Sequence, residues 1–291
     1  MSQAQEKLYQ ERFIRSYDTK KIYVREYGDP INSFATPIVC LSGLVRTSDD
    51  FNEFAHTCAQ QGFYVVSLDY RGRGYSDFDK NEENYRATKI LSDVMHVLNA
   101  LNIDKAIFVG TSFGGILSIA MSVMQPTRVK AIVTNDVGPE INTDGLGRIK
   151  EYVGNDHPQP NWETAVRSLK EMFPKIRLKD EDTWLAMAKG TFKEGNDGML
   201  HVRWDTNIAK TLGLRDTDPD LWDLYKGTKN IPMLAIRGLV SDVLSQETFD
   251  KMQELKPDLI RVGVEGVGHC PTFDEPAVLK ELVPFLNAHK D

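Results

Sequence analysis

The chain reads Val109-Gly110-Thr111-Ser112-Phe113-Gly114-Gly115 where an apolar run with β-strand character gives way to a segment typical of a buried helix. Gly110 and Gly114 lack side chains, so the backbone there can turn sharply between strand and helix. Such a turn holds the hydroxyl of Ser112 exposed at its tip. The stretch therefore predicts a nucleophile elbow, in which the start of the helix also points free N–H groups at any developing negative charge.

Strand-like and helix-like segments alternate on both sides of this turn. Two alternating runs within residues 13–27 predict a β-hairpin. The apolar strand-like runs that follow cover residues 37–41, 63–68, 105–108, 129–134, 232–237 and 259–264, and the helix-like segments cover residues 49–61, 87–101, 246–255 and 274–289. This order predicts an α/β fold with a mostly parallel eight-stranded sheet flanked by helices on both faces.

The alternation breaks between residues 139 and 227. Strand signals nearly vanish there, helical segments dominate over residues 161–173 and 181–192, and all four tryptophans of the chain fall in this range. We expect a core domain formed by residues 1–138 and 228–291 and a helical cap, or lid, formed by residues 139–227. The tryptophans either build a core for the cap or give an aromatic wall to a pocket beneath it.

The composition limits the kind of partner. The net charge is −7 and the isoelectric point is near 5.5, which gives no reason to expect nucleic acid or a membrane surface. Residues 1–15 are polar and lack the apolar segment of a signal peptide. The three cysteines are widely spaced, show no metal-binding pattern and favour a cytoplasmic protein with reduced thiols. The sequence gives no indication of the oligomeric state.

A serine nucleophile needs a base within hydrogen-bond reach and a carboxylate that orients this base. Of the six histidines, only His269 lies in a loop directly after a strand of the predicted sheet. The carboxyl ends of parallel strands share one edge, so this loop can face Ser112. Asp242, in the loop after the strand that ends at Arg237, is the favoured acid; Asp136, after the preceding strand, is the rival.

The order Ser112, Asp242, His269 resembles that of the α/β-hydrolase superfamily, in the branch with a helical cap domain. Four segments carry the resemblance: residues 110–115 (Gly-Thr-Ser-Phe-Gly-Gly), 69–76 (Asp-Tyr-Arg-Gly-Arg-Gly-Tyr-Ser), 237–242 (Arg-Gly-Leu-Val-Ser-Asp) and 268–271 (Gly-His-Cys-Pro). The resemblance implies a carboxylesterase-like serine hydrolase without a metal or organic cofactor. It also implies an oxyanion hole made by the backbone amides of Leu44 and Phe113.

Arg46 lies two residues beyond the predicted oxyanion residue Leu44 and has two interpretations. It could hold a carboxylate of the substrate at the mouth of the pocket. The alternative, which we favour, is a structural ion pair with an acid such as Asp49 or Asp136.

The expected reaction is hydrolysis of a carboxylic ester, or a related acyl bond, through an acyl-enzyme on Ser112. The aromatic and methionine side chains of the cap favour a moderately apolar small-molecule substrate of small to medium size. A carbon–carbon bond hydrolase of the meta-cleavage type, an acyltransferase and a perhydrolase remain alternatives within the same fold. Dehalogenases and epoxide hydrolases need a carboxylate in place of Ser112. A ligand receptor on a hydrolase scaffold is the alternative that is not an enzyme.

Overall fold

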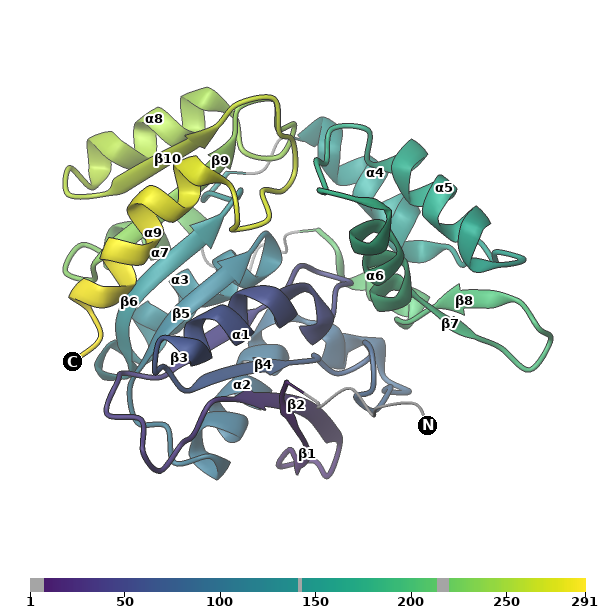
Figure 1. The fold of residues 1–291 in the computed structure, drawn as a ribbon, viewed down its shortest axis with the longest axis horizontal. Helices are drawn as coiled ribbons and strands as arrows, with labels where there is room; N and C mark the ends of the chain where they lie inside the picture. Colours follow the sequence, from purple (N-terminus) through teal and green to yellow (C-terminus); the bar gives the residue numbers. More distant parts are fainter. Residues whose placement is uncertain (1–7, 141–142, 214–219) are drawn as a thin grey trace.

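The computed structural model describes residues 8–140, 143–213 and 220–291 (Figure 1). Its large sheet has eight strands in the order β1-β2-β4-β3-β5-β6-β9-β10. The strands are β1 (Gln10–Arg15), β2 (Lys21–Tyr27), β3 (Ile38–Leu41), β4 (Val65–Leu68), β5 (Ala106–Thr111), β6 (Val129–Asn135), β9 (Met233–Gly238) and β10 (Ile260–Val264). Strands β1, β2 and β4 pair antiparallel, and every later pair is parallel, so the predicted fold class is confirmed.

Helices cover both faces of this sheet. One face carries α1 (Asn52–Gln60) and α9 (Pro276–Ala288), and the other carries α2 (Ala87–Ala100), α3 (Phe113–Met124), α7 (Leu221–Gly227) and α8 (Gln246–Leu255). Short 3-10 helices cover η1 (Ser48–Phe51), η2 (Glu82–Tyr85) and η3 (Pro126–Arg128). Within the described residues, no helix has the length and apolar character needed to cross a membrane.

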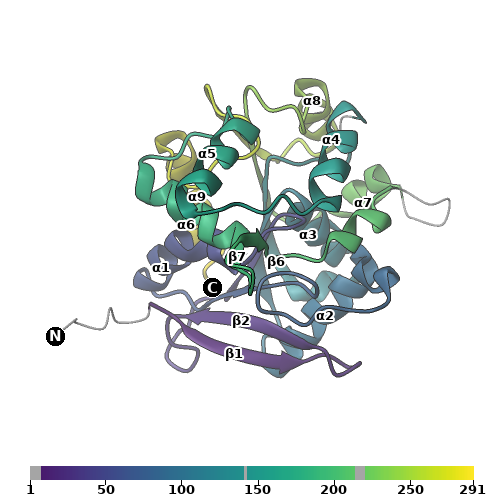
Figure 2. The ribbon, with the colours of Figure 1, turned by 90° about the vertical axis from the view of Figure 1, so that its right-hand side faces the viewer.

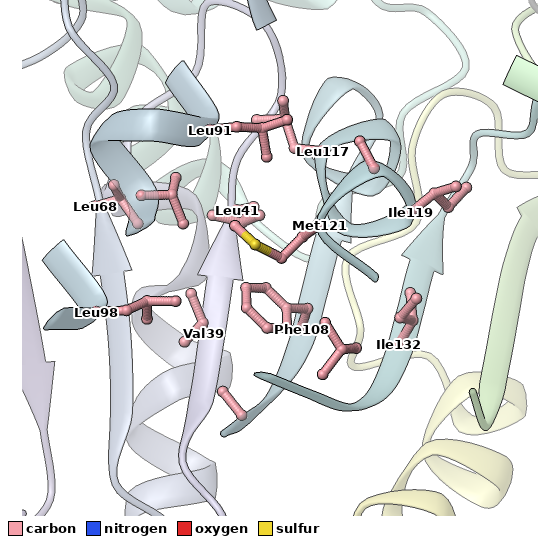
Figure 3. Close-up of a cluster of buried hydrophobic side chains, with 14 of the residues drawn as sticks. Val39, Leu41, Leu68, Leu91, Leu98, Phe108, Leu117, Ile119, Met121 and Ile132 are labelled. Carbon is pink, nitrogen blue, oxygen red and sulfur yellow. The ribbon is translucent and has the colours of Figure 1, made fainter. Parts of the chain in front are cut away.

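The strand side chains explain the two layers. On β5, Ile107 and Val109 face α1 and α9, whereas Ala106 and Phe108 face α2 and α3. Figure 3 shows Phe108 among side chains of neighbouring strands and of the helices on that face, including Met121. Because successive strand residues point to opposite faces, a strand buried on both faces must be apolar throughout. This requirement is why the parallel strands could be recognised as continuous apolar runs.

A mainly helical segment lies between β6 and β9, on the side toward which the strand arrowheads point (Figure 1), and faces the viewer in Figure 2. It contains α4 (Thr143–Gly154), α5 (Trp162–Met172), α6 (Glu181–Thr191), a hairpin of β7 (Phe192–Glu194) and β8 (Leu200–Val202), and η4 (Thr206–Thr211). We call these elements the cap. Both predicted helices are present, whereas the hairpin was not expected.

The cap has its own apolar cluster, in which Trp184 and Trp204 are buried. Trp222, by contrast, packs against the sheet-side cluster from α7. Helix α7 lies within the range predicted for the cap, yet it packs on α3, where a Cβ at Gly227 would come 2.7 Å from a side-chain carbon of Val123. The boundaries at residues 139 and 227 stay a prediction, but this packing groups α7 with the core.

Candidate active site

Ser112 lies at the junction of β5 and α3 in a strained backbone conformation, with φ = 52° and ψ = −119°. Its neighbours leave no room for side chains: a Cβ on Gly114 would stand 1.9 Å from the carbonyl oxygen of Leu41, and one on Gly110 would stand 2.3 Å from the backbone of Gly114. The N–H of Ser112 donates to the carbonyl of Asn135 (2.9 Å) at the end of β6. Close packing on two neighbouring strands thus holds the strained turn in place.

His269 is paired with Asp136. Its Nδ1 lies 2.7 Å from Oδ2 of the carboxylate, which is fully buried. Asp242 was the favoured acid, whereas the acid that lies against Nδ1 in this structure is its rival, Asp136; which of the two orients the histidine in catalysis stays a prediction. Nδ1 contacts the acid after β6, and the end of β9 with the loop after it contributes two donors to the same carboxylate. The N–H of Gly238 donates to Oδ1 of Asp136 (2.9 Å), and the hydroxyl of Ser241 donates to Oδ2 (2.5 Å).

The end of β6 brings the serine and the histidine to one place. Asn135 accepts from the N–H of Ser112, and its side-chain amide donates to the carbonyl of Pro271 (2.8 Å), two residues beyond His269. The next residue, Asp136, holds the imidazole itself. Ser112 and His269 both lie within the part of the chain that the structure describes, and no hydrogen bond joins the Ser112 hydroxyl to the His269 ring there. In ligand-free enzymes this contact is often long and tightens only when substrate binds.

The loop of residues 42–46 follows β3 and is fixed through its carbonyl groups. The carbonyl of Ser42 accepts from the hydroxyl of Tyr70 (3.0 Å), and that of Leu44 accepts from Nε of Arg73 (2.8 Å). Between them, the carbonyl of Gly43 accepts from the N–H of Arg46 (3.1 Å) and closes a turn. Because the N–H and C=O of a trans peptide point in opposite directions, this bond turns the N–H of Leu44 away from Arg46.

This loop lies beside the nucleophile, since a Cβ on Gly43 would stand 3.9 Å from Cβ of Ser112. The backbone N–H groups of Leu44 and Phe113 donate to no acceptor within the described part of the chain. Both donors are therefore available to a ligand. Their availability is consistent with the predicted oxyanion hole, although this role stays a prediction.

Arg73, which the sequence suggested would brace its own loop, donates from Nη1 to the carbonyl of Arg71 in that loop and from Nε to the carbonyl of Leu44 in the loop of residues 42–46. It is fully buried, and its Nη2 has no hydrogen-bond partner among the described residues. Burial lowers the pKa of Arg73 to about 10, against the opposing influence of Tyr70, Tyr85 and Asp205, so the guanidinium is still charged at neutral pH. The glycine-punctuated segment around it marked a structured loop, but nothing in its pattern indicated a bond to Leu44.

Arg46 forms an ion pair, but with a different acid from those expected. Its Nε and Nη2 pair with both carboxylate oxygens of Asp50, and Nη1 donates to the hydroxyl of Thr191 in the cap. Burial opposes the charged form, yet the adjacent Asp50 raises the pKa of Arg46 above its usual value. The predicted partner Asp49 instead pairs with Arg25 and Arg203.

The cap is seated directly on the loops of the site. The carbonyl of Lys175, in the α5–α6 connection, accepts from the N–H of Gly268 (2.8 Å), the residue before His269. On the other side, the N–H of Gly74 donates to the carbonyl of Arg203 (2.7 Å). These backbone bonds tie the histidine loop and the loop carrying Arg73 to the cap.

Ser241→Ala is expected to lower kcat about tenfold with little change in KM, because it removes a hydrogen bond to the charged Asp136 that holds His269. The Ser241 hydroxyl accepts from the N–H groups of Val243 and Leu244, so its own proton is directed at Asp136. Steady-state kinetics across a range of pH measures the effect.

The matched control is Ser245→Ala, four residues along. Ser245 caps α8 by accepting from the N–H of Thr248, so its loss costs about 1 kcal/mol of stability. It does not touch Asp136, and kcat should stay within about twofold. Equal losses of kcat in the two variants would contradict a specific role for Ser241.

Comparisons with known proteins agree with this architecture. A family model described as the alpha/beta hydrolase fold matches residues 36–175. The crystal structure of an alpha/beta hydrolase from Novosphingobium aromaticivorans is 33% identical, with a TM-score of 0.88, and the match covers 96% of this chain and 98% of that one. The chain therefore belongs to the α/β-hydrolase family.

Two characterised relatives are also hydrolases. A 3-hydroxybutyrate-oligomer hydrolase from Cupriavidus necator is 29% identical over 87% of this chain and 88% of its own. A 2-(acetamidomethylene)succinate hydrolase from Mesorhizobium japonicum is 28% identical over 78% of this chain and 79% of its own. Together these relatives support hydrolase activity for this protein.

Proposed function

We propose that this protein is a serine hydrolase that cleaves carboxylic esters through an acyl-enzyme on Ser112. The observation that carries the proposal is the contact between the buried Asp136 carboxylate and Nδ1 of His269. Asp136 directly follows Asn135, the last residue of β6, whose carbonyl accepts from the N–H of Ser112. In this arrangement His269 takes the proton of the Ser112 hydroxyl as the serine attacks the ester carbonyl. Asp136 keeps the ring in the required tautomer and stabilises the imidazolium that forms.

The tetrahedral intermediate carries its negative charge on the former carbonyl oxygen. The N–H groups of Leu44 and Phe113 bind this oxygen, and each such donor stabilises the transition state by about 2.7–4 kcal/mol. His269 then gives its proton to the leaving alcohol. Water, deprotonated by the same imidazole, resolves the acyl-enzyme and restores the serine.

The substrate we propose is a short aliphatic ester of a small to medium acid. The relative from Cupriavidus necator is a 3-hydroxybutyrate-oligomer hydrolase, which supports an acyl chain of this kind. The relative's oligoester is itself a chain of carboxylic esters, so one mechanism serves both.

Labelling with a fluorophosphonate tests the nucleophile. We expect one phosphonate per chain, on the peptide that contains Ser112, because only an activated serine reacts quickly with this probe. Intact mass and peptide mass spectrometry measure the adduct, and heat-denatured protein is the control. The rate of p-nitrophenyl butyrate hydrolysis should fall in proportion to the fraction of protein that is labelled.

Two results would overturn this proposal. An adduct on a serine other than Ser112 would move the nucleophile elsewhere. Tight binding of the probe without any covalent adduct or ester turnover would instead favour the receptor interpretation.

A further inference from the structure

A group of polar side chains lies where the cap meets the loop of residues 42–46. The side chain of Arg46 passes beside Gly43, with its Cγ 3.2 Å from the place of a Cβ there, and reaches the cap at Thr191. Its charge is balanced by the two-point pair with Asp50. The Thr191 hydroxyl accepts from Arg46 and donates to the carbonyl of Met187 (2.8 Å). These groups are satisfied by one another.

Tyr152, in the last turn of α4, differs from its neighbours in this group. Its hydroxyl oxygen is buried, and it has no hydrogen-bond partner within residues 8–140, 143–213 and 220–291. The ring is held in the cap by edge-to-face contact with Phe173 (centroids 5.8 Å apart) and by packing on Trp204 (5.2 Å). Buried polar groups are almost always hydrogen-bonded, so a fixed and unpartnered hydroxyl marks a place for a ligand atom.

Tyr152 packs against the same apolar cluster of the cap as Leu44, in the loop of residues 42–46. Burial raises the pKa of Tyr152 to about 12, with the nearby charges of Arg46 and Asp50 also acting on it, so it is a protonated donor at neutral pH. Phe173, which packs on the Tyr152 ring, lies two residues before Lys175, whose carbonyl accepts from the N–H of Gly268 in the histidine loop. On the other side, Gly43 separates Arg46 from Ser112. The Tyr152 side chain therefore lies in the part of the cap that contacts both the loop beside the nucleophile and the histidine loop.

The charges decide which substrate atom fits there. Arg46 and Asp50 neutralise each other, and an incoming carboxylate would meet the Asp50 carboxylate as well as the guanidinium. A neutral oxygen avoids this repulsion and can accept a hydrogen bond from the Tyr152 hydroxyl.

We propose that Tyr152 is a specificity-determining residue that binds a neutral oxygen, a hydroxyl or second ester carbonyl, on the acyl chain of the substrate. This inference rests on the ester hydrolysis proposed above. It also replaces the interpretation of Arg46 as a carboxylate-binding residue.

Three esters of matched length test this inference: ethyl 3-hydroxybutyrate, ethyl butyrate and monoethyl succinate. They carry a hydroxyl, no polar group and a carboxylate, respectively. We expect kcat/KM for the hydroxy ester to exceed that for ethyl butyrate by about tenfold, the effect of one hydrogen bond from a buried donor, and monoethyl succinate to be the poorest substrate. Titration of the released acid at constant pH measures all three.

Tyr152→Phe removes the hydroxyl oxygen and keeps the ring on Phe173 and Trp204. It should bring the ratio of the hydroxy ester to ethyl butyrate down to about one, and because the readout is a ratio, a general loss of activity cancels. Tyr225→Phe is the matched control, since that buried hydroxyl already donates to the carbonyl of Met252. Its ratio should equal that of the unmodified protein.

The outcomes separate the two proposals. If the unmodified protein hydrolyses none of the three esters, the proposed ester hydrolysis is wrong. If it hydrolyses ethyl butyrate but the ratio is the same with and without the Tyr152 hydroxyl, ester hydrolysis stands and the role of Tyr152 is overturned. A preference for monoethyl succinate would overturn it too, in favour of carboxylate binding by Arg46.

Discussion

Asp136→Asn is expected to lower kcat for ester hydrolysis by about 10⁴-fold, the effect of forcing a catalytic histidine into the wrong tautomer. The asparagine keeps the size of the buried side chain. Its carbonyl oxygen, in the place of Oδ1, can still accept from the N–H of Gly238, which in the present structure donates to Oδ1. Its NH₂ group then faces Nδ1 of His269 as a donor, so the ring must carry its proton on Nε2 and cannot take one from Ser112.

Asp242→Asn is the comparison that makes this prediction decisive. Asp242 is partly buried in the loop after β9, and Nδ1 of His269 already bonds to Asp136. We expect Asp242→Asn to change kcat by less than about tenfold, within the range of a nearby electrostatic effect. Steady-state kinetics of both variants, with circular dichroism to check folding, measures the difference. A larger loss from Asp242→Asn than from Asp136→Asn would restore Asp242 as the acid.

The choice between these two acids shows where prediction from the sequence ends. Both follow neighbouring parallel strands, so strand order alone brings both to the edge that carries Ser112. The two acids differ in the hydrogen bonds that the end of β9 and the following loop make. The N–H of Gly238 and the hydroxyl of Ser241 both donate to Asp136. These hydrogen bonds depend on contacts between distant segments, which local propensity does not encode.

The better predicted parts share a short-range physical cause. Strands such as β3 and β5 must be apolar on both faces, and the elbow requires glycine where a Cβ would strike the backbone of Leu41. These requirements are written into a few consecutive residues. The β7–β8 hairpin has strands of three residues each, too short for an alternating pattern to stand out.

Other features of the site depend on tertiary contacts. An ion pair of Arg46 was expected, but its partner is set by η1, whose turn presents Asp50 at helical spacing. Nothing near Tyr152 in the sequence indicated that its hydroxyl has no hydrogen-bond partner among the described residues, because this property depends on which distant segments surround it in the fold.

Ser112→Ala is expected to lower kcat by about 10⁶-fold, the scale seen when the nucleophile of a catalytic triad is removed. The fold should persist, because the alanine keeps the Cβ and the bond from the N–H of residue 112 to the carbonyl of Asn135. Binding of a non-hydrolysable ester analogue should also persist, since the amides of Leu44 and Phe113 are unchanged. Single-turnover kinetics and calorimetric titration measure the two properties separately.

Ser122→Ala is the matched control, because this buried serine of α3 donates only to the carbonyl of Ile119 and lies away from the elbow. It should keep kcat within about twofold. More than a tenth of the original turnover in Ser112→Ala would contradict an acyl-enzyme on this residue.

The strain at the elbow adds a second readout for the same position. With φ = 52° and ψ = −119°, residue 112 occupies a region that costs a residue with a Cβ about 1–3 kcal/mol. Glycine adopts it freely but loses about 0.4–1 kcal/mol through the greater freedom of its unfolded chain. Ser112→Gly should therefore be inactive yet about 1 kcal/mol more stable than Ser112→Ala in urea unfolding. This gain in stability would be the backbone strain at residue 112 that glycine relieves, less the entropic loss of glycine in the unfolded chain.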